Sequence, residues 1–262
     1  MNLRRPLFEV YWKMEKVIAP GLRYSQSVYE EVLNEAVQPG VRWLDVGCGH
    51  RVLPEWRTQA EMELVARAGR VAGVDPDASA IGKHRSLRDV QCASAEKLPF
   101  EKASFDLVTA NMVVEHLADP PGCIGEVRRV LAPGGLFIFH TPNALGHSTL
   151  LARLLPDVVK QFGAKLLDGR PSDDVYRTFY RLNSAPRVNK LAADQGWEVV
   201  GVRQIPTSAM FAVLAPLALM ELFWIRWTMS EAGAKYRTNL IVTLRRPLAL
   251  PRTAGHSPPL AG

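Results

Sequence analysis

The sequence predicts an α/β fold, in which a parallel β-sheet carries helices on both faces. Two observations indicate this fold. Between residues 40 and 145, short apolar segments alternate with segments of helical spacing, and repeated strand–helix–strand units of this length are typical of a parallel sheet. The apolar segments are also continuous rather than alternating with polar residues, as expected when both faces of a sheet are covered.

The N-terminal residues, 1–39, are expected to form a helical cap, because Ser25–Val37 has apolar residues at helical spacing and Gln38-Pro39-Gly40 then ends the helix. The main domain is expected over 40–246. Its expected strands are 41–46, 70–75, 88–94, 105–111, 136–141, 196–204 and 238–246. Its expected helices are 54–68, 78–86, 121–131 and 186–195. The proline-rich tail, 247–262, is expected to be disordered.

Composition limits the class of protein. The chain has 262 residues, of which 47% are apolar and 22% charged, which suits one globular domain with elaborations. Its net charge of +6 is spread along the chain without a long basic run, so a solvated basic surface is expected and no nucleic-acid partner. Cys48, Cys92 and Cys123 form no CxxC pair, and the first residues lack the apolar core of a signal peptide. We therefore expect a cytoplasmic protein without a metal site.

The stretch RWLDVGCGHR, residues 42–51, points to a ligand site. Gly47 and Gly49 let a loop approach a ligand closely at the end of a strand, where ligands of parallel sheets bind. Asp45, just before this loop, would repel a pyrophosphate but suits a cationic group. Asp75, at the end of GVDPD, would accept hydrogen bonds from ribose hydroxyls. A nucleoside with a cationic tail fits both acids, which favours S-adenosylmethionine over NAD or ATP.

Five motifs then follow in order over about residues 40–145. They read WLDVGCG, GVDPD, SAEKLPF (94–100), FDLVTANMVVEHLADP (105–120) and EVRRVLAPGGLFIFHTPN (126–143). Together they resemble the class I S-adenosylmethionine-dependent methyltransferases, in the branch of ubiquinone and menaquinone biosynthesis enzymes and bacterial small-molecule methyltransferases. The resemblance implies a Rossmann-like, seven-stranded, mostly parallel sheet whose last strand is antiparallel. It implies methyltransferase activity with S-adenosylmethionine, and it leaves the acceptor open.

The resemblance also implies roles for individual residues. Asp45 would lie near the methionine ammonium, and Asp75 would bind the ribose. The other residues implied to bind the cofactor are Gly47, Cys48, Gly49, Pro76, Ser94, Ala95, Glu96 and Asn111. Two positions depart from the family pattern, since Arg51 replaces a third glycine and Ser94 replaces an acid. The first loop is also long, so an extra turn is expected around His50–Trp56. These departures motivate an alternative, a cofactor-binding protein without methyltransferase activity.

Methyl transfer from a sulfonium is an in-line displacement, in which the protein mainly aligns the acceptor and excludes water. A general base is needed only when an acceptor hydroxyl keeps its proton. The candidate bases are His116 and His147; for both, a purely structural role is the alternative. We expect O-methylation of a small molecule. Tyr176, Tyr180 and Arg181 lie in an irregular segment, 142–190, where an acceptor cap is expected; packing on the sheet is the alternative.

The apolar block 209–229, within an insertion over 205–230, has three interpretations. Glu221, Arg226 and Pro216 argue against a membrane span, for which about 20 apolar residues are needed. The block could form a flap over the acceptor, the face of a homodimer, or a helix lying on a membrane surface. The last interpretation would suit a quinone or lipid-linked acceptor and a location peripheral to the inner face of a membrane.

Overall fold

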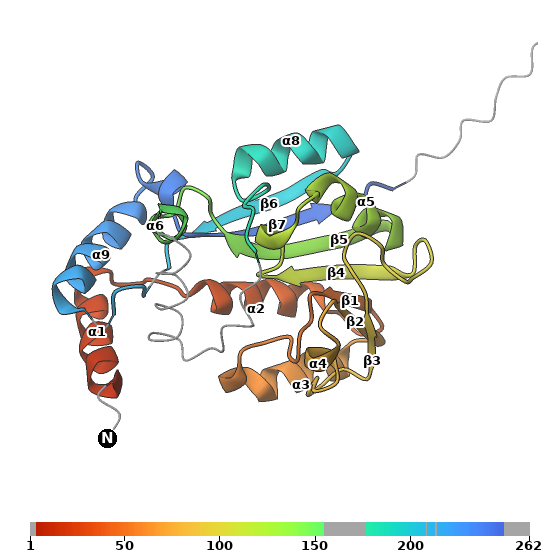
Figure 1. Cartoon of the computed structure of the whole chain (residues 1–262), viewed down its shortest axis with the longest axis horizontal. Helices are drawn as coiled ribbons and strands as arrows, with labels where there is room; N and C mark the ends of the chain where they lie inside the picture. The colour runs from red at the N-terminus through yellow and green to blue at the C-terminus, as the bar shows by residue number, and fades with distance from the viewer. Residues whose placement is uncertain (1–3, 155–176, 208, 213, 249–262) are drawn as a thin grey trace, which may run out of the picture.

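The computed structural model describes residues 4–154, 177–207, 209–212 and 214–248 (Figure 1). Its centre is a seven-stranded sheet of order β3-β2-β1-β4-β5-β7-β6. The strands are β1 Arg42–Val46, β2 Arg70–Asp75, β3 Asp89–Cys92, β4 Phe105–Asn111, β5 Leu131–Pro142, β6 Glu198–Ile205 and β7 Asn239–Arg245. Pairing is parallel from β3 to β5, and β7 is antiparallel to both of its neighbours. The predicted fold class, including the antiparallel last strand, is confirmed.

Helices cover both faces of this sheet, as Figure 1 shows. On one face lie α5 and α8, and on the other lie α2 and α3. The α-helices are α1 Arg4–Ile18, α2 Ser25–Ala36, α3 Thr58–Arg67, α4 Ala78–Ile81, α5 Pro120–Val130, α6 His147–Leu154, α8 Ala185–Gln195 and α9 Ala215–Thr228. Short 3-10 turns are η1 Glu55–Arg57, η2 Val114–His116 and η4 Ala234–Tyr236.

Strand β1 shows why the central strands read as continuous apolar segments. Leu44 and Val46 enter the core under α5, whereas Trp43 enters the separate core under α2 and α3. Successive side chains of a strand point to opposite faces, so a strand covered on both sides needs apolar residues at every position. The exceptions on β1 are Arg42 at its start, which pairs with Asp106, and Asp45, which is buried on the α2 side.

Several boundaries differ from the sequence-based expectation. The expected helix 54–68 is divided into η1 and α3, and the expected helix 78–86 is only α4, whose N-cap Asp77 accepts hydrogen bonds from Ser79 N and Ala80 N. Strand β5 begins at Leu131 instead of 136. The Ala-Pro-Gly-Gly turn signal lies inside it, as an irregularity in pairing with β4. A β-bulge absorbs extra residues without ending the strand. The Ala-Pro-Gly-Gly signal therefore marks an irregularity within β5 and not the start of the strand.

Helices α1 and α9 pack against each other at one end of the molecule, away from the sheet (Figure 1). Their contact buries Tyr11, Ala218 and Leu222 together with Ala212. The expected N-terminal cap therefore has two parts, because α2 belongs to the core of the sheet and α1 pairs with the apolar insertion. Within the described ranges, no helix has the length and apolarity needed to cross a membrane.

Candidate functional site

The loop after β1 adopts a conformation that requires glycine. Gly47 and Gly49 have φ of 70° and 51°, in the left-handed region. The loop folds over the end of β2, where Val74 O accepts hydrogen bonds from Gly47 N at 2.7 Å and Cys48 N at 3.1 Å. A Cβ on Gly47 would lie 2.3 Å from Cγ2 of Val113. The first glycine is thus fixed by both backbone conformation and close packing.

Asp75 joins this loop to the one that follows β2. Its Oδ2 accepts a hydrogen bond from Gly49 N at 2.9 Å, and its Oδ1 accepts one from Asp77 N at 2.9 Å. The side chain is almost fully buried. A carboxylate has about four acceptor positions, so Asp75 keeps capacity for the hydroxyl groups of a ligand while it holds the two loops together.

A cavity of about 200 Å³ opens at the carboxyl ends of β1, β2 and β3. This is the edge at which parallel sheets bind ligands, beside the point where strand order reverses between β1 and β4. Six of the residues singled out from the sequence line it, namely Gly47, Pro76, Ser94, Ala95, Glu96 and His116. The Ser94 hydroxyl accepts a hydrogen bond from Glu96 N at 3.2 Å and so orders the turn that forms one wall.

Asp45 does not line this cavity; it lies in a buried polar chain on the α2 side of the sheet. Trp43 Nε1 donates to Thr109 Oγ1 at 2.8 Å, and this hydroxyl donates to Asp45 Oδ1 at 2.5 Å. Burial raises the pKa of Asp45 to about 7, the hydrogen bond from Thr109 opposes this rise, and the charges of Glu61 and Asp75 add to it. Asp45 is thus a buried acid beside the ligand edge of the sheet, with a pKa raised toward neutrality.

A second polar cluster lies at the end of β4. Asn111 Nδ2 donates to Gln26 Oε1 at 3.2 Å, and His140 Nδ1 lies 2.9 Å from Asn111 Oδ1. Burial lowers the pKa of His140 to about 4, so its ring is neutral at physiological pH and donates through Nδ1. Met112, which follows Asn111 in the chain, has φ of 58°, a strained value for a side chain of its size. Helical spacing alone gave no sign that Gln26 of α2 belongs here.

Glu115 and His116 follow on η2. Glu115 is buried, and its Oε2 accepts a hydrogen bond from Thr141 Oγ1 at 2.8 Å. Burial is the main cause that raises the pKa of Glu115. His116 Nδ1 lies 3.1 Å from Arg177 O, and a carbonyl only accepts, so Nδ1 carries the proton of a neutral ring. Nε2, which is 4.0 Å from Glu115 Oε1, is then the basic nitrogen.

The remaining candidates lie outside the cavity. His147, at the start of α6, has Nε2 3.0 Å from Oε1 of the buried Glu221 on α9. Tyr180 has φ of 51°, and its backbone N donates to Glu115 O at 3.1 Å. Arg181 donates to Ala118 O, and its guanidinium lies 5.4 Å from the centroid of the Phe179 ring. Tyr176 lies outside the described residues.

Arg51, one of the two departures from the family pattern, does not line the cavity. Its guanidinium donates to Glu55 Oε1 at 3.0 Å and lies 2.8 Å from His50 Nε2. The expected extra turn is present as η1, which Glu61 supports by accepting hydrogen bonds from Val52 N and Leu53 N. Cys48 is buried in the core beside Gly73. A Cβ placed on Gly73 would lie 2.7 Å from Sγ of Cys48.

The known proteins to which this chain is similar include methyltransferases. Residues 44–139 match the family model described as a methyltransferase domain. The ubiquinone biosynthesis O-methyltransferase of Bradyrhizobium sp. is 38% identical over 43% of this chain and 44% of its own length. That of Aromatoleum aromaticum is 28% identical over 66% of this chain and 72% of its own length. The chain thus spans less than half of the first of these two relatives.

Among solved structures, geranyl diphosphate C-methyltransferase from Streptomyces coelicolor superposes with a TM-score of 0.51 at 16% identity. The match covers 84% of this chain and 78% of the other, whose crystal structure holds S-adenosyl-L-homocysteine. At this identity the likeness concerns the fold.

Proposed function

The chain belongs to the class I S-adenosylmethionine-dependent methyltransferases through its domain at residues 44–139, and on this premise we propose that it transfers the methyl group to an oxygen of a small-molecule acceptor. S-adenosylmethionine is the cofactor of this family. The observation that carries the proposal is the cavity at the carboxyl edge, where Gly47 meets the segment Ser94–Glu96.

In this proposal the adenine occupies the cavity between Pro76 and Ser94–Glu96, and the ribose hydroxyls donate to Asp75. Support comes from the size and place of the cavity, and from the acceptor positions that Asp75 retains beside the first loop. The methionine ammonium would approach Asp45 and the end of β4 at Asn111. The raised pKa of Asp45 suits this role, because a nearby cation would favour the carboxylate form.

The proposed reaction is a single displacement. An acceptor oxygen attacks the methyl carbon in line, the carbon–sulfur bond breaks, and its electron pair goes to sulfur, which leaves S-adenosyl-L-homocysteine. If the acceptor is a hydroxyl, its proton must pass to a base. We favour His116 for this role over His147, because His116 lines the cavity, whereas His147 does not and its Nε2 lies 3.0 Å from Glu221 Oε1.

The acceptor is proposed to be a phenol of the quinone-precursor type. The similar proteins include O-methyltransferases of ubiquinone biosynthesis. Two cations near the cavity, Arg177 and Arg181, each lie over the ring of Phe179 at 5.1 and 5.4 Å from its centroid. They would favour an acceptor that carries a carboxylate or another anionic group.

Calorimetry and turnover together test the proposal. The chain is titrated with S-adenosylmethionine and S-adenosyl-L-homocysteine, and donor consumption is then measured over a panel of phenols. We expect binding of both nucleosides, turnover with at least one phenol, and a loss of turnover of about a hundredfold in His116→Ala that exceeds any loss of donor affinity. Failure to bind either nucleoside would refute the proposal.

A second candidate function is cofactor binding without methyl transfer. Arg51 favours it, because a charged residue stands where the family has glycine. In that case both nucleosides would bind and no member of an acceptor panel, including lipid-soluble phenols, would be consumed. The salt bridge of Arg51 to Glu55 speaks for activity, since it keeps the guanidinium along the loop.

A further inference from the structure

Helix α9 exposes a continuous apolar face. Its buried side carries Ala218, Leu222 and Ile225, which pack toward α1 and the body of the protein. The opposite side carries exposed apolar residues without an intervening charge, namely Leu217, Leu219, Met220, Phe223, Trp224 and Trp227. Met220 is 69% exposed and Phe223 63%. A surface helix normally presents charged residues on its outer side, so this face indicates an apolar partner.

Helix α1, which packs against the buried side of α9, exposes apolar residues of its own. Its Tyr11 is buried against α9, while Val10 and Val17, on one stripe of the helix, are exposed, Val17 by 80%. Trp12 is also exposed, and its ring centroid lies 5.9 Å from that of Phe8. These exposed side chains belong to two helices that pack against each other at one end of the molecule, as the ribbon in Figure 1 shows.

Aromatic rings and cations border this apolar area. Trp224, Trp227 and Tyr236 form a cluster with ring centroids 4.8 to 6.0 Å apart, and Lys235 Nζ lies 4.9 Å from the centroid of Tyr236. Where exposure is described, the exposed charges on α1, α9 and η4 are the cations Lys13, Lys16, Arg226 and Lys235 and the acid Glu9, and Glu231 is exposed just before η4. Tryptophan with lysine and arginine beside an apolar face is typical of helices at a lipid–water interface.

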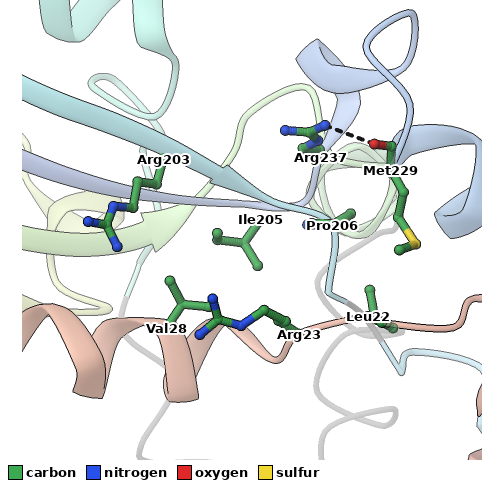
Figure 2. A pocket seen from close by; sticks show the side chains of 9 residues that line it. Leu22, Arg23, Val28, Arg203, Ile205, Pro206, Met229 and Arg237 are labelled. Atoms are coloured by element: carbon green, nitrogen blue, oxygen red, sulfur yellow. Dashed lines mark hydrogen bonds between the residues drawn. The ribbon is translucent and has the colours of Figure 1, made fainter.

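A cavity of about 290 Å³ begins where α9 ends, and three arginines line it. Figure 2 shows Arg23 before α2, Arg203 on β6 and Arg237 before β7 around apolar side chains that include Ile205. Arg237 is anchored, since it donates to Thr228 O at 2.9 Å and Met229 O at 3.0 Å.

Two of these arginines are half-exposed in weak ion pairs. Arg23 pairs with Glu31, and Arg203 lies 3.8 Å from Glu35, both exposed carboxylates. Exposed pairs of this kind contribute about 0–1 kcal/mol, so a phosphate group could replace the carboxylates at low cost. The cavity therefore offers a basic, partly apolar recess beside the end of the apolar helix.

We propose that the exposed faces of α1 and α9 bind the surface of an anionic membrane, and that the arginine-lined cavity takes a lipid phosphate. A second copy of the chain fits this face less well. An isologous dimer would bring Lys13, Lys16, Arg226 and Lys235 close to the same cations of its partner, in a chain of net charge +6. A negatively charged lipid surface complements that charge instead.

Vesicle flotation of the full chain tests the proposal and needs neither cofactor nor acceptor, so it is independent of the proposed reaction. Vesicles contain phosphatidylcholine alone or with phosphatidylglycerol. We expect flotation with the anionic vesicles and weaker flotation at high salt. The double variant Met220→Ser/Phe223→Ser should weaken binding by about tenfold or more, because it removes apolar area that enters the interface.

The matched control is Met62→Ser, the same change at an exposed methionine of α3, which should bind like the parent. Circular dichroism of each variant checks that it folds. Arg23→Gln/Arg203→Gln should weaken binding to anionic vesicles by about tenfold or more, at roughly 1 kcal/mol per arginine. Inorganic phosphate at millimolar concentration should leave vesicle binding unchanged.

Three outcomes would overturn the proposal. The first is a protein that remains soluble with both kinds of vesicle. The second is a dimer in sedimentation velocity without lipid that Met220→Ser/Phe223→Ser dissociates, which would assign the face to a second copy. The third concerns the cavity alone: saturable binding of inorganic phosphate that Arg203→Gln abolishes, with vesicle binding unaffected, would assign the cavity to a free anion.

Discussion

The acid at the end of β1 illustrates how a single residue links the core to the site. Asp45 is buried with one hydroxyl donor, Thr109, and its carboxylate form is costly in the absence of a cation. Burial therefore raises its pKa to about 7. A cationic ligand nearby would relieve this cost, so the acid that destabilises the empty site would contribute to ligand affinity.

The pH dependence of Asp45 gives the first prediction. If the methionine ammonium lies beside it, binding lowers its pKa, a proton is released, and donor affinity falls as pH drops below about 7. Calorimetry in buffers of different ionisation enthalpy measures the released proton. Asp45→Asn should release none at this site. An affinity with the same pH profile in both proteins would contradict the proposed role.

The same residue has a consequence for the empty protein. An acid whose pKa is raised from 3.8 to about 7 on folding stabilises the protein when protonated, and this contribution is lost as pH rises between those values. The free energy of unfolding of the parent should therefore fall, relative to Asp45→Asn, between about pH 4 and pH 7. Urea unfolding of both proteins over this range measures the difference; parallel curves would be evidence against the raised pKa.

Gly47 gives another prediction at the scale of a residue. In Gly47→Ala the new Cβ would collide with Val113, which lines the cavity, and the positive φ would also be strained. We expect donor affinity to fall by at least about tenfold, with about 1–2 kcal/mol lost in stability. Gly40→Ala is the control, because Gly40 has φ of +84° with nothing near its Cβ and lies away from the cavity. It should lose less stability than Gly47→Ala, because only its positive φ is strained, and it should keep its donor affinity.

At the scale of elements, the sequence predicted those whose cause is local. The strands of the first half follow from continuous apolar segments, and the loop after β1 follows from Gly47 and Gly49 beside two acids. The end of α4, where Gly82 is the C-cap, was missed. The start of β5 was missed because it depends on a bulge opposite β4. The pairing of α1 with α9 joins segments about 200 residues apart, and no local pattern records such a contact.

Site residues that belong to a local motif were predicted, whereas those placed by contacts between distant segments were missed. Residues carried by motifs, such as Gly47 and Ala95, do line the cavity. Gln26 was missed because its contact with Asn111 comes from the docking of α2, which has no motif at that position. Glu221 was noted only as a charge that interrupts an apolar block, although it is buried and faces His147.

The attachment of α9 gives a prediction at this scale. Glu221 accepts hydrogen bonds from Met210 N at 3.1 Å and Phe211 N at 3.0 Å and faces His147, so Glu221→Ala leaves several groups without their acceptor. We expect a loss of about 2–4 kcal/mol in the free energy of unfolding. Glu231→Ala, at an exposed glutamate, should change it by less than about 0.5 kcal/mol. Equal losses would show that Glu221 does not hold α9 in place.

At the scale of the whole molecule, the carboxyl ends of the parallel strands face the end of the molecule that carries the apolar helices α1 and α9. The arrows of β4 and β5 point toward the end of the molecule where α1, α6 and α9 lie (Figure 1). The carboxyl ends of parallel strands carry the ligand site. A membrane bound by α1 and α9 would therefore adjoin the side from which an acceptor reaches the cofactor.

This arrangement predicts that vesicles affect the turnover of a lipid-soluble acceptor but not that of a water-soluble one. With a lipid-soluble phenol, anionic vesicles should raise turnover several-fold, and Met220→Ser/Phe223→Ser should remove that gain. With a water-soluble phenol, the parent and the variant should turn over equally, with or without vesicles. A variant that is slower on both acceptors would indicate damage to the reaction site, and the membrane would then have no part in acceptor delivery.

The most direct test of the central claim is a crystal structure of the chain with S-adenosyl-L-homocysteine. The account predicts adenine in the cavity formed by Pro76 and Ser94–Glu96, ribose hydroxyls on Asp75, and the amino group on the side of Asp45. A nucleoside bound elsewhere, or a ligand whose phosphates lie across Gly47–Gly49, would contradict it.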